Sequence, residues 1–175
     1  MTSATSNKRA GKKARSEDET TLINRAEGVR KRWEVALASE EALTPYSNAN
    51  GVLRRGVYNF VRTARDKGIS DLMEDLVRAR VKQVRASENN QANPFYWGLL
   101  LVCGYDRRLS ATTRNRFVQE MLYADLHDVP TEFLVGFLYQ VADPNGLQRR
   151  LDKGMREDWY VKKQEKLRRL AESGE

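Results

Sequence analysis

Apolar residues recur every three or four positions along most of this chain, and this spacing constrains the fold more than any other feature of the sequence. It places apolar side chains on one face of each helix, and such a face must pack against a neighbour. The pattern predicts an all-α fold of about seven helices, arranged as a bundle or a short helical-repeat array. The expected helices cover residues 20–38, 52–67, 70–86, 94–103, 111–124, 131–141 and 147–172.

One of these segments, Pro94–Cys103, differs from the others because it is apolar nearly all round. A helix of that composition is usually buried on every side. Proline suits the first turn of a helix, and Gly104 suits its end. We therefore expect this segment to be the central helix of the domain.

The first 15 residues have the opposite character, since they are small, polar and basic and include no acidic residue. Such a segment cannot bury enough apolar surface to offset the entropy lost on ordering. We expect residues 1–19 to form a disordered basic arm, residues 20–172 a single helical domain, and residues 173–175 a tail. The arm would contact phosphates, and the alternative is a solvated tail or a localisation signal. Its cations are Lys8, Arg9, Lys12, Lys13 and Arg15.

The formal net charge of +7 and the pI of about 9.6 indicate a polyanionic partner. The longest apolar run, Leu99–Cys103, is too short to span a bilayer, and the N-terminus lacks the hydrophobic region of a secretory signal. Cys103 is the only cysteine, so we expect no internal disulfide. We expect nucleic acid rather than a membrane as the partner. The expected location is intracellular and cytoplasmic, or the virion if the protein is a coat subunit.

A row of cations with one aromatic ring lies along the helix predicted to follow residue 51. Arg54, Tyr58, Arg62 and Arg65 are spaced four, four and three residues apart, beside the apolar face. Arginines can bind a phosphate backbone while a tyrosine stacks on a base. The alternative, which this row taken alone favours, is that Tyr58 borders the core and the arginines are solvated.

A second basic cluster surrounds the start of the fifth predicted helix. Acidic residues usually occupy a first helical turn, but here Arg114 and Arg116 lie near that end, and Arg107 and Arg108 precede it. Cations in this position are unfavourable unless an anion is bound, and free N–H groups beside arginines form a phosphate site. The alternative is that Asp106 neutralises part of the cluster.

The segment Val129–Leu170 holds the strongest signals of order. An apolar helix is predicted first, then a turn at Asp143–Gly146, and then a long basic helix. The basic helix repeats the cation-and-tyrosine spacing of the second helix. The residues concerned are Arg149, Lys153, Arg156 and Tyr160.

Several short motifs in this segment recur, in the same order, in one known family. They are Val129-Pro130-Thr131, Phe133-Leu134, Phe137, Gly146–Leu151 and Asp158-Trp159-Tyr160. In these residues the chain resembles the TROVE module of Ro-type RNA-binding proteins. The resemblance implies stacked antiparallel helix pairs, and structured or single-stranded RNA as the ligand. The family's full module is a longer ring of helical repeats than this chain can close, so no residue role is transferred.

The sequence shows no catalytic or metal-binding constellation. It has no Gly-rich phosphate loop, no metal-ligand spacing and no nucleophile beside a base. His127 is the only histidine, and with its neighbour Asp128 it does not complete a triad. We expect it to be a surface or capping side chain. We therefore expect no enzymatic activity, no cofactor and no metal ion.

These observations favour an RNA-binding or ribonucleoprotein-scaffolding protein whose basic helix rows contact the phosphate backbone. Two alternatives stay open. One is a nucleic-acid-coating structural subunit that forms homo-oligomers, such as a viral nucleocapsid or coat protein, or a small subunit of a ribonucleoprotein complex. The other is a protein–protein adaptor whose basic charge is incidental.

Overall fold

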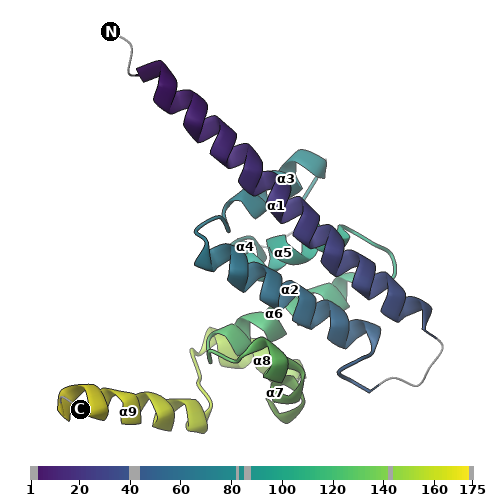
Figure 1. Ribbon diagram of the computed structural model, residues 1–175. Coiled ribbons are helices and arrows are strands. Elements are labelled where there is room, and N and C mark those ends of the chain that lie inside the picture. Colours follow the sequence, from purple (N-terminus) through teal and green to yellow (C-terminus); the bar gives the residue numbers. More distant parts are fainter. Residues whose placement is uncertain (1–3, 40–43, 82, 85–87, 142–143, 174–175) are drawn as a thin grey trace.

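The computed structural model describes residues 4–39, 44–81, 83–84, 88–141 and 144–173, and for residues 4–14, 88–89, 144–145 and 173 it describes the backbone alone. Every regular element in these ranges is a helix, which confirms the predicted all-α fold (Figure 1). In chain order the elements are α1 (Ala4–Ala38), α2 (Ala49–Asp66), α3 (Leu72–Arg80), α4 (Glu88–Gln91), α5 (Pro94–Cys103), α6 (Ala111–Asp125), the 3-10 turn η1 (Thr131–Phe133), α7 (Leu134–Val141), α8 (Pro144–Asp152) and α9 (Asp158–Ser173).

Helix α5 is the central helix of the domain, as predicted. Asn93 caps its start by accepting a hydrogen bond from the Phe95 backbone N–H, and Pro94 occupies its first turn. All residues from Phe95 to Cys103 are buried, and α5 packs against α1, α2, α3, α4 and α6. Burial of one large apolar side chain stabilises a fold by about 1.5–3 kcal/mol, so this helix is a major source of stability. Neither α5 nor any other helix among the described residues has both the length and the apolar content needed to cross a membrane.

Helices α1 and α2 lie side by side and run in opposite directions (Figure 1). On α1 the side chains of Leu22, Ala26, Val29 and Trp33 are buried. Gly56 of α2 lies directly opposite α1, because a Cβ atom built on Gly56 would come within 2.6 Å of Cγ1 of Val29. The missing side chain therefore allows the two helices to approach closely.

Helices α6, α7 and α8 form the second part of the domain. Helix α6 packs against α5, α7 and α8, and so connects this part to the central helix. Two elements project from the domain: the first half of α1 at the N-terminal end, and α9 at the C-terminal end (Figure 1). These projections leave long helical surfaces that the domain itself does not cover.

The structure differs from the prediction at the N-terminus. Helix α1 begins at Ala4, so residues 4–19 are helical rather than a disordered arm, and residues 1–3 lie outside the described residues. Alanine, lysine, arginine and glutamate, which are frequent here, all favour the helical state. Extension of a helix that is already anchored by a buried face also needs no new nucleation.

The long basic helix predicted over residues 147–172 is two helices. Gly154 adopts a positive φ of 61°, and α8 ends just before it. The Gly154 N–H donates to the Leu151 carbonyl at 3.0 Å, and the Met155 N–H donates to the Arg150 carbonyl at 2.9 Å. These are the two hydrogen bonds of a Schellman C-terminal motif, which glycine favours because it lacks a Cβ atom. Helix α9 then starts in a new direction at Asp158.

The helix predicted over residues 70–86 is also shorter than expected. Helix α3 ends at Arg80, and Val81 adopts an extended conformation. Val81 and Val84 pack against the core from this extended segment. Their β-branched side chains suit that conformation. Between this segment and Pro94, residues 88–91 form the short helix α4.

A substitution at Gly98 would test how closely α5 packs on α2. A Cβ atom on Gly98 would overlap Cγ2 of Val61, whereas one on Gly136 of α7 would meet no atom within 4 Å. We expect Gly98→Ala to lower the free energy of unfolding by about 1–3 kcal/mol through overpacking. Gly136→Ala is the matched control, and it should leave that free energy unchanged or raise it by about 0.4–1 kcal/mol. Urea titration followed by circular dichroism measures both, and equal effects would contradict the packing described here.

Candidate nucleic-acid interface

Two members of the predicted α2 row are buried. The Arg54 guanidinium pairs with Glu120 of α6 at 2.9 Å, and both side chains are nearly inaccessible to solvent. The Tyr58 side chain is fully buried, donates its hydroxyl hydrogen to the Val129 carbonyl at 2.7 Å, and stacks on Phe95. Burial raises the pKa of Tyr58 to about 12. Neither side chain can contact RNA from these positions.

The other two members of the row bind groups at the end of α6. Arg65 donates two hydrogen bonds to the Asp125 carboxylate, at 2.5 and 2.9 Å. Arg62 donates to the Val129 carbonyl at 2.7 Å and lies 3.7 Å from Asp125. The prediction of a phosphate-binding row on α2 is therefore wrong for Arg54 and Tyr58, which are buried. Arg62 and Arg65 help to join α2 to α6, and their contact with phosphates stays a prediction. The alternative was correct for Tyr58, although the arginines are paired rather than solvated.

The basic cluster at the start of α6 is largely neutralised inside the protein. Ser110 caps α6 by accepting a hydrogen bond from the Thr113 N–H at 3.1 Å. Arg108 pairs with Asp106 at 2.6 Å and lies over the Trp33 ring. Hydrogen bonds from Arg108 lower the pKa of Asp106 to about 2. The alternative, in which Asp106 neutralises part of the cluster, is confirmed for Arg108.

The remaining arginines of that cluster differ in their surroundings. Arg114 is buried, and it donates to the Leu109 carbonyl at 3.1 Å. Arg116 lies 3.6 Å from Glu120. Arg107 is exposed, and no acid in the described part of the chain pairs with it. Three of the four arginines of the predicted anion site therefore have partners within the protein.

Arg15 ties α1 to α3 instead of extending into solvent. It pairs with Glu19 at 3.1 Å and with Asp75 of α3 at 2.6 Å. The other predicted cations of the N-terminal arm lie on the helical backbone of α1, and their contact with phosphates stays a prediction. The side chains outside the described residues are those of Lys8, Arg9, Lys12 and Lys13.

The predicted cations near the C-terminus have a different environment. Arg149 and Lys153 are exposed and form no ion pair with a described residue. Arg156 is half-buried, and its guanidinium donates to two backbone carbonyls. Helix α9 adds further exposed lysines and arginines. We call the whole set the C-terminal basic segment, and its members are Arg149, Lys153, Arg156, Lys162, Lys163, Lys166 and Arg169.

His127 anchors the start of α9, and it is buried rather than at the surface. Its Nδ1 hydrogen-bonds with the Tyr123 carbonyl at 2.7 Å, and its Nε2 accepts from the Glu157 backbone N–H at 2.9 Å. This arrangement requires the neutral ring with its hydrogen on Nδ1. The ring centroid lies 5.9 Å from that of Trp159 and 5.1 Å from that of Tyr160. Tyr160, a predicted stacking residue, is therefore half-buried against the histidine.

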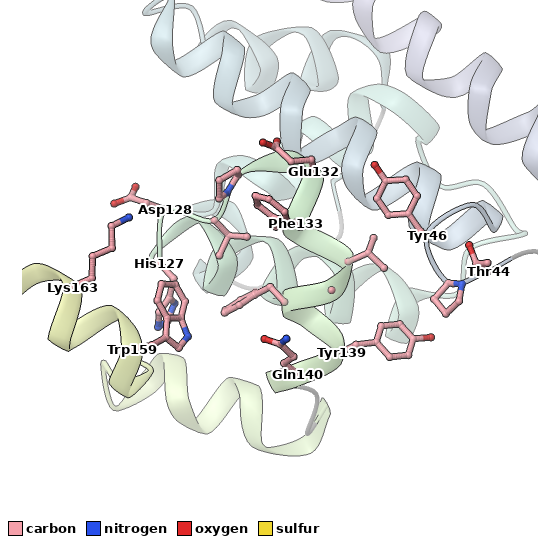
Figure 2. Close-up of a pocket in the computed structure, with 16 residues that line it drawn as sticks. Thr44, Tyr46, His127, Asp128, Glu132, Phe133, Tyr139, Gln140, Trp159 and Lys163 are labelled. Atoms are coloured by element: carbon pink, nitrogen blue, oxygen red, sulfur yellow. The ribbon is translucent and has the colours of Figure 1, made fainter.

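A groove of about 740 Å³ opens beside His127, between the loop that precedes α2, helix α7 and the first turns of α9 (Figure 2). This groove is not predictable from the sequence, because its walls come from segments that are far apart in the chain. Several aromatic side chains in its walls are still exposed. They are Tyr46 (44%), Phe133 (64%), Tyr139 (61%) and Trp159 (45%). We call this feature the aromatic groove.

Charged side chains lie along one side of the aromatic groove. Asp128 and Glu132 are both on this side, together with Lys163 of α9 (Figure 2). Asp128 accepts a long hydrogen bond from the Tyr160 hydroxyl at 3.5 Å. Neither carboxylate forms an ion pair with a residue that the structure describes. The groove therefore combines an apolar surface with a charged edge, on which two carboxylates outnumber one lysine.

The described side chains include no group of three or more His, Cys, Asp or Glu residues that could hold a metal ion. Cys103 is buried, and burial raises the pKa of its thiol to about 12. A thiol with that pKa stays protonated near neutral pH and is a poor nucleophile.

Comparisons of the chain with protein-family models, with curated proteins and with solved structures found no match. The resemblance to the TROVE module stays a prediction that rests on the motifs between Val129 and Tyr160. A proposal of function therefore depends on the site itself.

The environment of His127 makes the stability of the fold dependent on pH. Burial lowers the pKa of His127 below its ordinary value of 6.5; the Tyr123 hydrogen bond, Glu157 and Asp128 oppose this shift, and Arg156 adds to it. The unfolded chain binds a proton near pH 6.5, whereas the folded protein resists protonation, so acidification favours unfolding. We expect the urea midpoint to fall as the pH drops from about 8 to 5.

The control for this experiment is His127→Gln, because His127 is the only histidine in the chain. The variant should be less stable than the wild type, but its midpoint should change much less over the same pH range. An equal pH dependence in both proteins would contradict the assignment to His127.

Proposed function

We propose that this protein binds nucleic acid, with RNA as the expected ligand, through the C-terminal basic segment. One observation carries the proposal. The cations of this segment form no ion pair with a described acid, whereas cations of α2 and of the α6 start are neutralised by Glu120, Asp125 and Asp106. Exposed cations without a described acid partner are therefore grouped on α8, α9 and the turn between them, and a second group lies on α1 at Arg25, Lys31 and Arg32.

Cations of this kind bind a phosphate backbone by displacing its condensed counterions. The binding is independent of base sequence and weakens steeply with salt. Trp159 lies beside these cations and is about half-exposed, so its indole ring is accessible to an unpaired base. A row of cations beside an exposed aromatic ring suits single-stranded nucleic acid.

The domain holds this segment in a defined position. Helix α8 packs on α6, and Arg150 of α8 pairs with Glu157 at 2.7 Å. The Glu157 backbone N–H binds His127. These contacts fix the turn between α8 and α9, so the cations on both helices keep their relative positions before a ligand arrives. Such preorganisation reduces the entropy lost on binding.

A nucleic-acid-coating structural subunit is the second candidate, and the projecting helices favour it. The first half of α1 and most of α9 extend beyond the domain (Figure 1). Subunits that assemble along a nucleic acid commonly cover such surfaces with their neighbours. In this form of the proposal the same basic segment contacts the phosphates.

Neutralising the segment should weaken RNA binding and reduce its salt dependence. The variant carries Arg149→Gln, Lys153→Gln and Arg156→Gln. The slope of log K against log salt is about −0.7 per phosphate contact on a single strand, so losing three contacts should reduce its magnitude by about 2. Fluorescence anisotropy with a labelled single-stranded RNA, between about 50 and 200 mM salt, measures this slope.

The matched control removes three exposed cations from α1 instead, by Arg25→Gln, Lys31→Gln and Arg32→Gln. It lowers the net charge by the same amount, so any general effect of charge appears in both proteins. An equal loss of RNA affinity in the two variants would indicate that RNA does not bind specifically at the C-terminal basic segment. Undiminished RNA affinity in the first variant would contradict the proposal and favour the adaptor alternative.

A further inference from the structure

The distal part of α9, residues 164–173, carries a short apolar row made of the exposed side chains of Leu167 and Leu170. Trp159 and Lys163, in the first turns of α9, lie on the same face, and the four positions are spaced four, four and three residues apart. The Leu167 side chain is 50% exposed, and every side chain from Val161 to Glu172 is exposed. A row of this spacing on a charged helix is typical of a helix that binds in the groove of a partner.

The aromatic groove has the complementary properties. Its walls present exposed rings of Phe133 and Tyr139, and burying them would remove apolar surface from water. Its edge carries Asp128 and Glu132. On α9 the cation Lys166 directly precedes Leu167 in the sequence and lies beside the apolar row. A helix with leucines on one face and cations next to them therefore matches the groove in polarity and in charge.

The groove cannot receive the distal part of its own α9. Trp159 and Lys163, in the first turns of α9, already line it. The rest of α9 is one continuous helix up to Ser173 and leads away from the domain (Figure 1). At about 1.5 Å per residue, its end lies more than 10 Å beyond Lys163. If an α9 helix occupies the groove, it must therefore come from another molecule.

We propose that the distal part of α9 of one molecule docks in the aromatic groove of a second copy of this chain. The chain itself supplies a helix with the polarity and charge that the groove requires. Because α9 projects from the domain, a second molecule can reach it without contacting the rest of the first. Leu167 enters between Phe133 and Tyr139, and Lys166 approaches Asp128 or Glu132.

The two surfaces in this contact are different, so the contact joins molecules head to tail. A pair of molecules joined in this way keeps one unused groove and one unused α9, and assembly continues until a ring closes or a filament forms. The inference does not rest on nucleic-acid binding, since every contact is between protein side chains. It is tested on protein freed of nucleic acid by nuclease treatment.

Two variants test the α9 surface and the groove surface independently. Leu167→Asp places a charge in the apolar row of α9 and leaves the groove intact. Gly136→Lys fills the groove with a cation, in a position where an added Cβ meets no atom within 4 Å. Their controls are Val161→Asp, which puts the same charge on another face of α9, and Gly136→Ala, which leaves the groove open. Circular dichroism establishes that all four variants fold.

Sedimentation velocity measures the mass of each protein from micromolar to several hundred micromolar concentration. The wild type and both controls should rise well above the monomer mass of 20.1 kDa, and each of the two variants should stay at it. An equimolar mixture of Leu167→Asp and Gly136→Lys should form dimers and nothing larger. In the mixture, the intact α9 of one variant meets the intact groove of the other, and no further contact is available.

Three results would each overturn the inference. The first is a wild-type protein that stays monomeric over the whole range, which would assign the groove to a different partner or to none. The second is assembly of Leu167→Asp alone, or of Gly136→Lys alone, to the same extent as the wild type. The third is an assembling wild type whose two variants form no dimers when mixed, which would indicate a symmetric contact between like surfaces.

Discussion

Complete burial of α5 is the constraint on which the rest of this structure depends. A ten-residue helix with no polar face has to be surrounded, and α1, α2, α3 and α6 each present an apolar face to it. Gly98 allows α2 to approach so closely that even one added carbon would overlap Val61. Packing around α5 fixes the orientation of these four helices. Polar side chains at their edges are thereby brought together where neighbouring helices meet, and we call these contacts the seams.

Several arginines of the domain lie at those seams. Arg54 with Glu120 and Arg65 with Asp125 join α2 to α6, and Arg15 with Asp75 joins α1 to α3. A charge that is buried or partly buried needs a partner, because an unpaired one is costly to remove from water. The positive charge at these seams therefore serves the stability of the domain. The exposed cations of the C-terminal basic segment, like those of α1, have no acid partner among the described residues.

His127 connects the domain to that segment. One side of its ring lies against Tyr123 of α6, and the other meets Trp159 and Tyr160 of α9. Both ring nitrogens are used in hydrogen bonds. The same contact fixes one wall of the aromatic groove. The C-terminal basic segment and the aromatic groove thus both include residues of α9. If both proposals hold, RNA binding to the segment and docking of a second copy at the groove would be expected to influence each other.

Local signals in the sequence are sufficient to place most of the helices. Pro94–Cys103 is predicted with the observed bounds, because Pro94 and Gly104 act through adjacent backbone atoms. The helical state of residues 4–19 is not predictable in this way, because it depends on attachment to a buried helix. The break at Gly154 is not predictable either, because one glycine competes there with many helix-favouring neighbours.

Only the tertiary structure decided which side chains are available for binding. The spacing of Arg54 and Tyr58 placed them in one row, but whether that row meets solvent depends on Glu120 and Val129, more than 60 residues away. His127 and the aromatic groove gave no sequence signal for the same reason. Helical periodicity is a property of consecutive residues, whereas burial and charge neutralisation are properties of residues that packing brings together.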